Sequence, residues 1–144
     1  MFKILKRTFA LSMLICLISC TNTTNQSGKT LKLSESFVTQ VEQGQIEAAF
    51  EMLKAHWPMS NVEVDNLKNH TMRQRKVVVS RYGEPQAVEF VKTELVGKSL
   101  VRHTFIEKFE SHALKWELSF YKNKGKWLIS TVYWDDEIST LFKG

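Results

Sequence analysis

The chain contains little cysteine, proline or glycine: two Cys, two Pro and six Gly in 144 residues. Both cysteines, Cys16 and Cys20, lie within the first 20 residues, so a disulfide framework cannot hold the part of the chain that follows. The low proline and glycine content excludes collagen-like and low-complexity chains. With 43% hydrophobic and 24% charged residues, the sequence is typical of one globular domain held by packing alone.

Motifs that specify a reaction or a metal are also missing. The sequence has no Gly-rich phosphate loop, no His-Glu-x-x-His and no serine nucleophile elbow. Its four histidines share no metal-ligand spacing. The formal net charge of +5 includes Lys3, Lys6 and Arg7, which lie in a segment expected to be removed; the remaining 17 basic residues face 15 acids. We therefore expect no cofactor, no metal and no nucleic-acid partner.

The first 20 residues have the pattern of a processing segment. A basic start is followed by an apolar run over residues 9–18, interrupted only by Ser12. The run is shorter than the roughly 20 apolar residues that a membrane-spanning helix needs. We therefore predict that it is a signal sequence.

The residues that end this run, Leu17-Ile18-Ser19-Cys20, resemble the bacterial lipobox. The resemblance implies that residues 1–19 form a lipoprotein signal peptide and that Cys20 is acylated, which anchors the protein to a membrane. Thr21, where an Asp would suggest inner-membrane retention, favours the outer membrane facing the periplasm. The alternative is an ordinary secretory signal that is cut near Ser19 or Cys20.

The polar segment over residues 21–32 contains Gly28 and shows no apolar periodicity. It predicts a flexible tether, which together with the lipidated cysteine spans residues 20–33 and holds the domain about 20 Å from the bilayer. The domain itself is expected over residues 34–144.

Two short helices are expected first. Ser34 is a candidate N-cap for a helix that carries Phe37, Val38 and Val41 and ends at Gly44. The second helix is expected over residues 45–57, where four apolar residues fall on one face: Ile46, Phe50, Leu53 and Trp57.

A longer third helix has start and stop signals at both ends. Ser60 and Glu63 fit a capping box, and Met59 with Val64 fit a hydrophobic staple. Helical spacing then continues to Tyr82 through Val64, Leu67, Thr71, Arg75 and Val78, and Gly83 and Pro85 end the helix.

After Pro85 the apolar period changes from 3.6 to 2. Four alternating segments, at 86–96, 100–109, 113–121 and 126–134, predict an antiparallel meander. The apolar faces of the second and third strands match only if odd positions pair with even ones. The fourth strand has apolar residues on both faces, so its register stays open. Together these elements predict an α+β fold, with two short helices and a longer capped helix on a curved four-stranded antiparallel sheet.

Several runs within this order resemble the nuclear-transport-factor-2-like, or cystatin-like, cone family. They are residues 81–85 (RYGEP), 116–122 (WELSFYK), 125–127 (GKW) and 134–136 (WDD). The resemblance spans the domain and implies a concave cavity between helices and sheet. Because the family includes ketosteroid isomerase, polyketide cyclases and many non-catalytic binding modules, it implies a fold and no single activity.

Candidate site residues follow from the expected faces. His103, on the apolar face of the second strand, is the only candidate general base, with a packed core histidine as the alternative. A possible pocket is formed by Trp57, His103, Phe105, Trp116 and Tyr133, each of which could instead belong to the core.

Charged residues and the other histidines have structural interpretations. We interpret Asp135, Asp136 and Glu137 as a solvated strand end, His56 as a helix-end cation, and His70 and His112 as surface and turn positions. Arg73, Arg75, Lys76 and Arg81 are interpreted as the solvated face of the third helix, or as a group that orients the domain on an anionic bilayer.

The function that these observations favour is a lipid-anchored envelope protein that acts as a non-catalytic binding or interaction module, for a small apolar ligand or an envelope protein. The alternative is an isomerase- or dehydratase-type enzyme that uses His103 and one of the acids. A homodimer formed through the exposed sheet face is a third possibility.

Overall fold

A computed structural model describes the chain over residues 21–142, and its side chains from residue 28 onward. The elements in chain order are α1 (Thr21–Glu42), α2 (Ile46–Lys54), α3 (Asn61–Tyr82), β1 (Pro85–Val96), β2 (Leu100–Phe109), β3 (Ala113–Asn123), β4 (Lys126–Asp135) and the 3₁₀ helix η1 (Ile138–Phe142). The predicted signal peptide and Cys20 lie outside the described residues. Within 21–142 no helix has the length and apolar character needed to cross a membrane.

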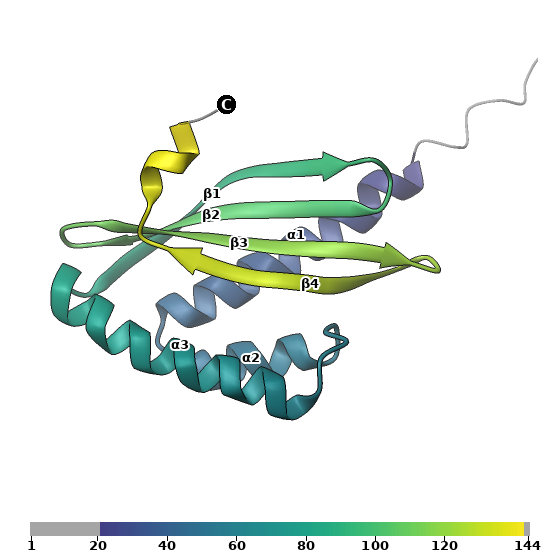
Figure 1. The fold of residues 1–144 in the computed structure, drawn as a ribbon. Coiled ribbons are helices and arrows are strands. Elements are labelled where there is room, and N and C mark those ends of the chain that lie inside the picture. The colour runs from purple at the N-terminus through teal and green to yellow at the C-terminus, as the bar shows by residue number, and fades with distance from the viewer. Residues whose placement is uncertain (1–20, 143–144) are drawn as a thin grey trace, which may run out of the picture.

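The four strands form one antiparallel sheet in the order β1-β2-β3-β4. The three α-helices cover one face of this open, curved sheet, and η1 lies on the other side (Figure 1). The predicted α+β fold and meander are confirmed. Their register is the expected one, because Val101 pairs with Phe120 and Phe105 pairs with Trp116.

A β-bulge explains why the sequence of β4 has apolar residues on both faces. Phe120 pairs with Ile129 and Ser119 pairs with Thr131, so Ser130 is the extra residue. A bulge shifts the alternation by one position. Ile129, before the bulge, and Val132 and Trp134, after it, therefore all reach the core between sheet and helices.

The core fills the space between the helices and the sheet. Its largest fully buried apolar side chains come from α1, α2, β2, β3 and β4 and include Phe37, Phe50, Leu53, Phe105, Trp116, Leu118, Phe120 and Ile129. Phe37 of α1 meets both Phe50 and Trp116 edge to face, with ring centroids 5.3 and 5.6 Å apart. Such contacts stabilise the junction of α1, α2 and β3 beyond the area they bury.

The first helix is longer than predicted, and the predicted tether over residues 21–32 is wrong. Helix α1 begins at Thr21, and Ser34 lies inside it, where its hydroxyl donates to the carbonyl of Thr30 at 2.8 Å. Thr30 and Ser34 continue the buried face of Phe37, Val38 and Val41 at helical spacing. Because the hydroxyl residues Thr30 and Ser34 occupy this face ahead of Phe37, its helical period is not visible there as apolar periodicity.

The third helix begins where the capping box predicts. The Ser60 hydroxyl accepts from the backbone N–H of Glu63, and the Glu63 carboxylate accepts from the backbone N–H of Ser60 at 2.9 Å. The Ser60 hydroxyl also donates to the Glu63 carboxylate at 2.8 Å, and the two hydrogen bonds that this carboxylate accepts from Ser60 lower the pKa of Glu63. At the other end, Gly83 has φ +86°, and a Cβ there would collide with the side chain of Glu110. The stop is therefore specific for glycine.

We expect Ser60→Ala to lower the free energy of unfolding by about 1 kcal/mol, because the amide of Glu63 loses its acceptor. Urea denaturation of the protein measures this change. Asn61→Ala, at the next exposed position, serves as the control that keeps the box. If both variants unfold at the wild-type midpoint, the box does not stabilise α3.

Candidate binding groove and the buried histidine

His103 is completely buried and links three elements of the fold. Its Nδ1 lies 2.8 Å from the hydroxyl of Thr93 on β1, and its Nε2 lies 2.8 Å from the hydroxyl of Thr30 on α1. The ring also meets Phe120 edge to face at 5.8 Å. The residue predicted as a candidate base therefore holds α1 against the β1–β2 hairpin.

Burial lowers the pKa of His103 to about 4. The imidazole is therefore neutral near pH 7, with one nitrogen as donor and the other as acceptor. Both nitrogens are occupied by threonine hydroxyls, and His103 is not among the residues that line either groove described below. A general base must reach the proton it removes, whereas the hydroxyls of Thr30 and Thr93 contact the two ring nitrogens of His103 in this structure.

A buried ion pair lies further along the same face of β2. Both terminal nitrogens of the Arg75 guanidinium donate to the Glu107 carboxylate, at 2.7 and 2.6 Å. The indole N–H of Trp116 also donates to this carboxylate at 2.8 Å, and Arg75 stacks over the ring of Phe109. The sequence interpretation of Arg75 as part of a solvated helix face is wrong, although Arg73, Lys76 and Arg81 are exposed.

The residues predicted to form a pocket do not share a cavity. Trp57, Phe105 and Trp116 are buried in the core with His103. Tyr133 pairs with Glu117 on the opposite face of the sheet and is 52% exposed. The space that the cone resemblance implied as a cavity is filled at these positions.

A groove of about 400 Å³ lies at the edge of the core, between α1, the end of α2 and the β3–β4 hairpin. Its lining residues come from these three elements: Lys29, Thr30, Leu33, Ala55, His56, Phe120, Gly125, Lys126, Trp127 and Leu128. The backbone carbonyl of His56 accepts from the N–H of Ile129 at 2.8 Å, which fixes the end of α2 against β4. Two lysines and no carboxylate belong to the lining, so the groove suits an apolar or anionic molecule.

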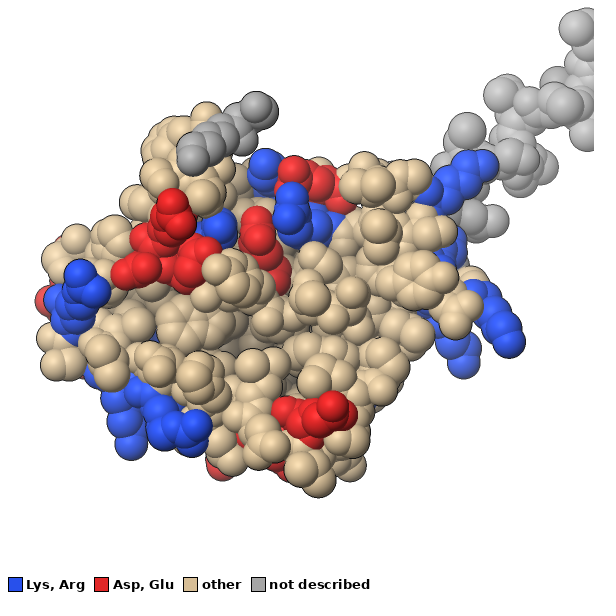
Figure 2. All heavy atoms as spheres, in the orientation of Figure 1, with Lys and Arg blue, Asp and Glu red and all other residues tan. Residues whose placement is uncertain are grey.

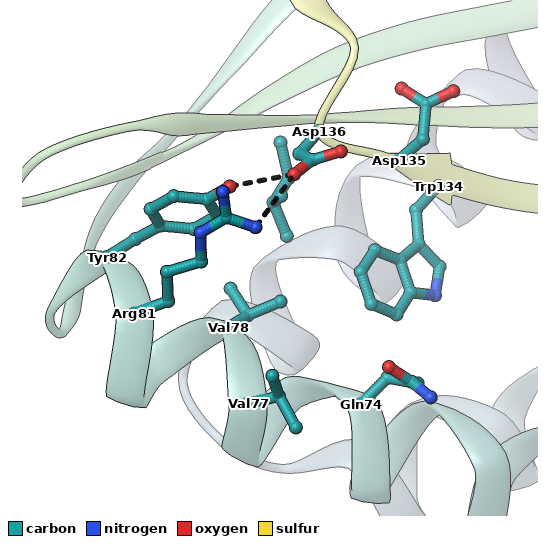
Figure 3. A pocket seen from close by; sticks show the side chains of 9 residues that line it. Gln74, Val77, Val78, Arg81, Tyr82, Trp134, Asp135 and Asp136 are labelled. Carbon is teal, nitrogen blue, oxygen red and sulfur yellow. Dashed lines mark hydrogen bonds and ion pairs between the residues drawn. The ribbon is translucent and has the colours of Figure 1, made fainter.

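A smaller cavity of about 200 Å³ lies between the end of α3 and the end of β4 (Figure 3). The Tyr82 hydroxyl donates to Asp136 at 2.7 Å, and the Arg81 guanidinium lies 4.0 Å from the same carboxylate. The hydrogen bond lowers the pKa of Asp136 and raises the pKa of Tyr82. The Tyr82 hydroxyl and the Asp136 carboxylate already bind each other, so this cavity is the weaker candidate.

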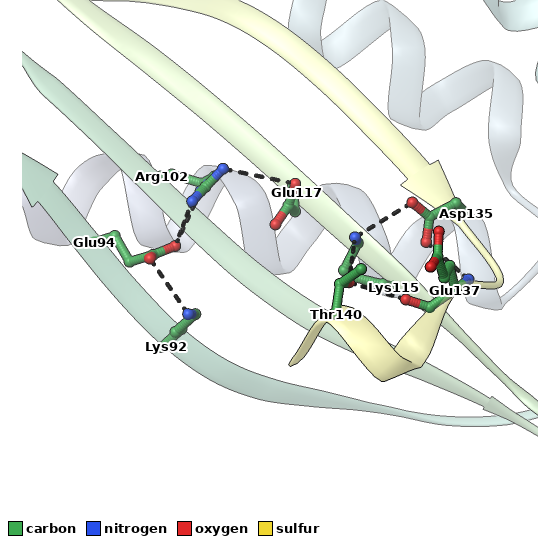
Figure 4. A network of polar contacts seen from close by, with 8 residues as sticks. All are labelled: Lys92, Glu94, Arg102, Lys115, Glu117, Asp135, Glu137 and Thr140. Carbon is green, nitrogen blue, oxygen red and sulfur yellow. Dashed lines mark hydrogen bonds and ion pairs between the residues drawn. The ribbon is translucent and has the colours of Figure 1, made fainter. Parts of the chain in front are cut away.

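The acidic residues at the end of β4 form more contacts within the chain than the interpretation of a solvated strand end predicts. Asp135 pairs with Lys115 at 3.2 Å, and Lys115 also donates to Thr140 of η1 at 2.9 Å (Figure 4). Glu137 donates its backbone N–H to Asp135 at 3.0 Å. This part of the outer sheet face is therefore occupied by contacts within the chain.

A second polar group on the outer face lies closer to the sheet edge. Arg102 joins Glu94 of β1 at 2.9 Å and Glu117 of β3 at 3.8 Å, and Lys92 also pairs with Glu94 (Figure 4). These side chains are partly exposed, so each pair stabilises the fold only slightly. The homodimer through this face stays a prediction.

Comparison with known proteins identifies no relative: no protein family, no curated protein and no solved structure matches the chain.

Proposed function

We propose that this protein is a lipid-anchored envelope protein that acts as a non-catalytic binding module of the cystatin-like cone type. Acylation at Cys20 anchors it in the outer membrane facing the periplasm, and the groove between α1, α2 and β4 takes a small apolar ligand. The groove carries the proposal, because its volume of about 400 Å³ lies in the range of small-molecule sites.

The non-catalytic part of the proposal is supported by the environment of His103. An isomerase or dehydratase of this architecture needs a base and a hydrogen-bond donor that both face the substrate. His103 is enclosed by threonine hydroxyls and core side chains, and Glu107 is held by Arg75 and Trp116. The groove itself contains His56 and two lysines but no carboxylate.

The anchor is tested with Cys20→Ser in the full chain. Several acyl chains are needed for stable attachment, and each buried CH₂ contributes about 0.8 kcal/mol. We expect the wild type to gain the mass of the acyl chains and to fractionate with membranes, whereas Cys20→Ser gains no acyl mass and keeps residues 1–19 or becomes soluble. Mass spectrometry of the N-terminal peptide and membrane fractionation decide this. A wild-type peptide without acyl mass would contradict the anchor.

The groove is tested by filling it. Ala55 is exposed at the end of α2 and lines the groove, whereas Ala48 is exposed on the same helix and does not. We expect 2-naphthol to shift the indole N–H signal of Trp127 in the NMR spectrum of the ¹⁵N-labelled chain, and Ala55→Trp to reduce that shift at least several-fold.

Ala48→Trp is the matched control, because it adds the same side chain outside the groove and should leave the shift unchanged. The signal of Trp127 is assigned by its loss in Trp127→Phe. If 2-naphthol shifts no indole signal, or if Ala55→Trp binds the probe as the wild type does, the groove is not the binding site.

A further inference from the structure

Three segments that are distant in the sequence meet at one end of the molecule. In a four-stranded meander the β1–β2 and β3–β4 turns share one end of the sheet, and α1 begins beside them (Figure 1). The N–H of Lys122 donates to the carbonyl of Ser99 at 2.8 Å, which joins the two hairpins directly. The β2–β3 turn and the end of α3 lie at the opposite end, joined by a bond from the N–H of Ser111 to the carbonyl of Tyr82.

The charge of this end differs from that of the rest of the chain. Residues 21–34, 95–101 and 118–134 contain six lysines and no Asp or Glu: Lys29, Lys32, Lys98, Lys122, Lys124 and Lys126. We call these six residues the anchor-end lysines. The other described residues contain ten Lys and Arg and fifteen Asp and Glu. The end where α1 begins is therefore purely basic, while the rest of the described chain is acidic on balance, although Figure 2 shows that Lys and Arg side chains also gather at the opposite, lower left part of the molecule.

None of the anchor-end lysines forms an ion pair with a carboxylate of the described residues. Every ion pair within the described residues involves other cations, such as Lys54, Arg75 and Arg102. Five of the six lysines are exposed, and Lys122 lies over the ring of Trp127. Their charge is therefore free to act on an external anion.

Apolar side chains lie exposed beside these lysines. Val96 pairs with Leu100, and Leu100 pairs with Tyr121, so the three lie side by side on the outer face of the sheet. Their exposed fractions are 66%, 44% and 46%, respectively. Leu95, which pairs with Val101 on the inner face at the same end of β1, is 57% exposed. Exposed aliphatic and aromatic residues bordered by lysines are typical of protein surfaces that rest in lipid headgroups.

We propose that the end of the domain formed by these lysines and apolar residues docks on the surface of an anionic bilayer. The proposal rests on the acyl anchor at Cys20 proposed above. Because α1 begins at Thr21 and rises 1.5 Å per residue, Lys29 lies about 12 Å along the helix from its start. This distance of about 12 Å along the helix is comparable to the Debye length of about 8 Å at physiological ionic strength. The negative potential of the lipid headgroups is therefore only partly screened at the anchor-end lysines.

Docking in this way fixes the orientation of the domain. The binding groove includes Lys29 and Lys126, so it lies at the docked end, near the lipid. The acidic remainder of the molecule, with Asp136 and Glu110 near the opposite end, faces away from the anionic surface. Attraction at one end and repulsion at the other both favour the same orientation.

The test compares probes at the two ends of the full chain. Ser99→Cys places a thiol in the exposed β1–β2 turn, and Ser80→Cys places one on the exposed side of α3 near its end. Each protein is labelled with bimane and reconstituted in vesicles of neutral phosphatidylcholine, with or without anionic phosphatidylglycerol, that contain headgroup-spin-labelled lipid. In the anionic vesicles we expect quenching at residue 99 to exceed quenching at residue 80 at least three-fold.

Matched charge removals show whether the lysines cause this preference. Lys98→Gln with Lys124→Gln should reduce quenching at residue 99 at least two-fold, as should 0.5 M salt. Arg73→Gln with Lys76→Gln removes the same charge from exposed positions of α3 and should leave quenching unchanged. Equal quenching at residues 99 and 80 would overturn docking. So would quenching at residue 99 that is the same with and without phosphatidylglycerol and is unchanged by the lysine substitutions. A chain that does not float with either vesicle would overturn the anchor as well.

Discussion

Glu107→Gln is expected to lower the free energy of unfolding by about 3 to 5 kcal/mol. The Arg75 side chain is 6% exposed and that of Glu107 is completely buried, so the substitution leaves a guanidinium charge in the core with no anion beside it. The glutamine amide also keeps only one of the two acceptor oxygens of Glu107, so the bidentate contact with Arg75 is lost. Urea denaturation with a constant m-value measures the loss.

Two further variants separate the buried charge from the simple loss of a carboxylate. Glu94→Gln removes an anion from a pair whose partner, Arg102, is 45% exposed, and it should cost no more than about 1 kcal/mol. Arg75→Met with Glu107→Leu removes both charges, and it should recover much of the stability lost in Glu107→Gln, because no unpaired charge remains. If Glu107→Gln unfolds like Glu94→Gln, the Arg75 pair does not hold α3 to the sheet.

The regular elements were predictable because local signals agree with the tertiary structure. The capping box at Ser60 and the alternation of the strands each specify an element without reference to the rest of the chain. The first helix was underestimated for the opposite reason: it buries Thr30 and Ser34, whose hydroxyls bond to His103 and to the α1 backbone. Because Thr and Ser are polar residue types, the sequence does not reveal that their hydrogen-bonded hydroxyls are buried, and the apolar periodicity of the helix is interrupted at these positions.

The ion pair between Arg75 and Glu107 was missed although both residues carry a signal. Glu107 follows Val101, His103 and Phe105 on alternate positions of the buried face, and Arg75 lies four residues after the buried Thr71. When the buried face of a helix and the buried face of a strand each carry one charged residue, and the two charges have opposite sign, the sequence predicts an ion pair between them. The reason is that a single unpaired charge in the core destabilises the fold. The interpretation of the arginine as part of a solvated face disregarded this periodicity.

The groove could not be predicted from the sequence. Its lining comes from α1, the end of α2 and the β3–β4 hairpin, and the last two are joined by the bond from the N–H of Ile129 to the carbonyl of His56. Apolar periodicity identifies which residues face the core, but it does not show where the core surface is left open. The candidate pocket residues chosen for their aromatic rings, such as Trp116, fill the interior instead.

His103 should make the stability of the protein strongly dependent on pH. Its pKa is about 4 in the folded protein, whereas an unfolded chain returns it to the ordinary value of 6.5. Below pH 6.5 the unfolded state therefore binds a proton that the folded state does not bind, which favours unfolding. The stabilisation is complete above pH 6.5 and is lost as the pH falls to about 4, below which both states are protonated. A shift of this size corresponds to about 3 kcal/mol.

We therefore expect the wild type to lose about 3 kcal/mol more than His103→Gln between pH 6.5 and pH 4, whatever the stability of the variant at pH 7. The comparison isolates His103, because the carboxylates titrate in both proteins. His70→Gln, at an exposed position of α3, should retain the wild-type dependence. Urea denaturation at half-unit pH steps measures the three curves. Parallel curves for the wild type and His103→Gln would mean that the imidazole accepts a proton in the folded protein, and that its contacts with Thr30 and Thr93 open readily enough to admit water.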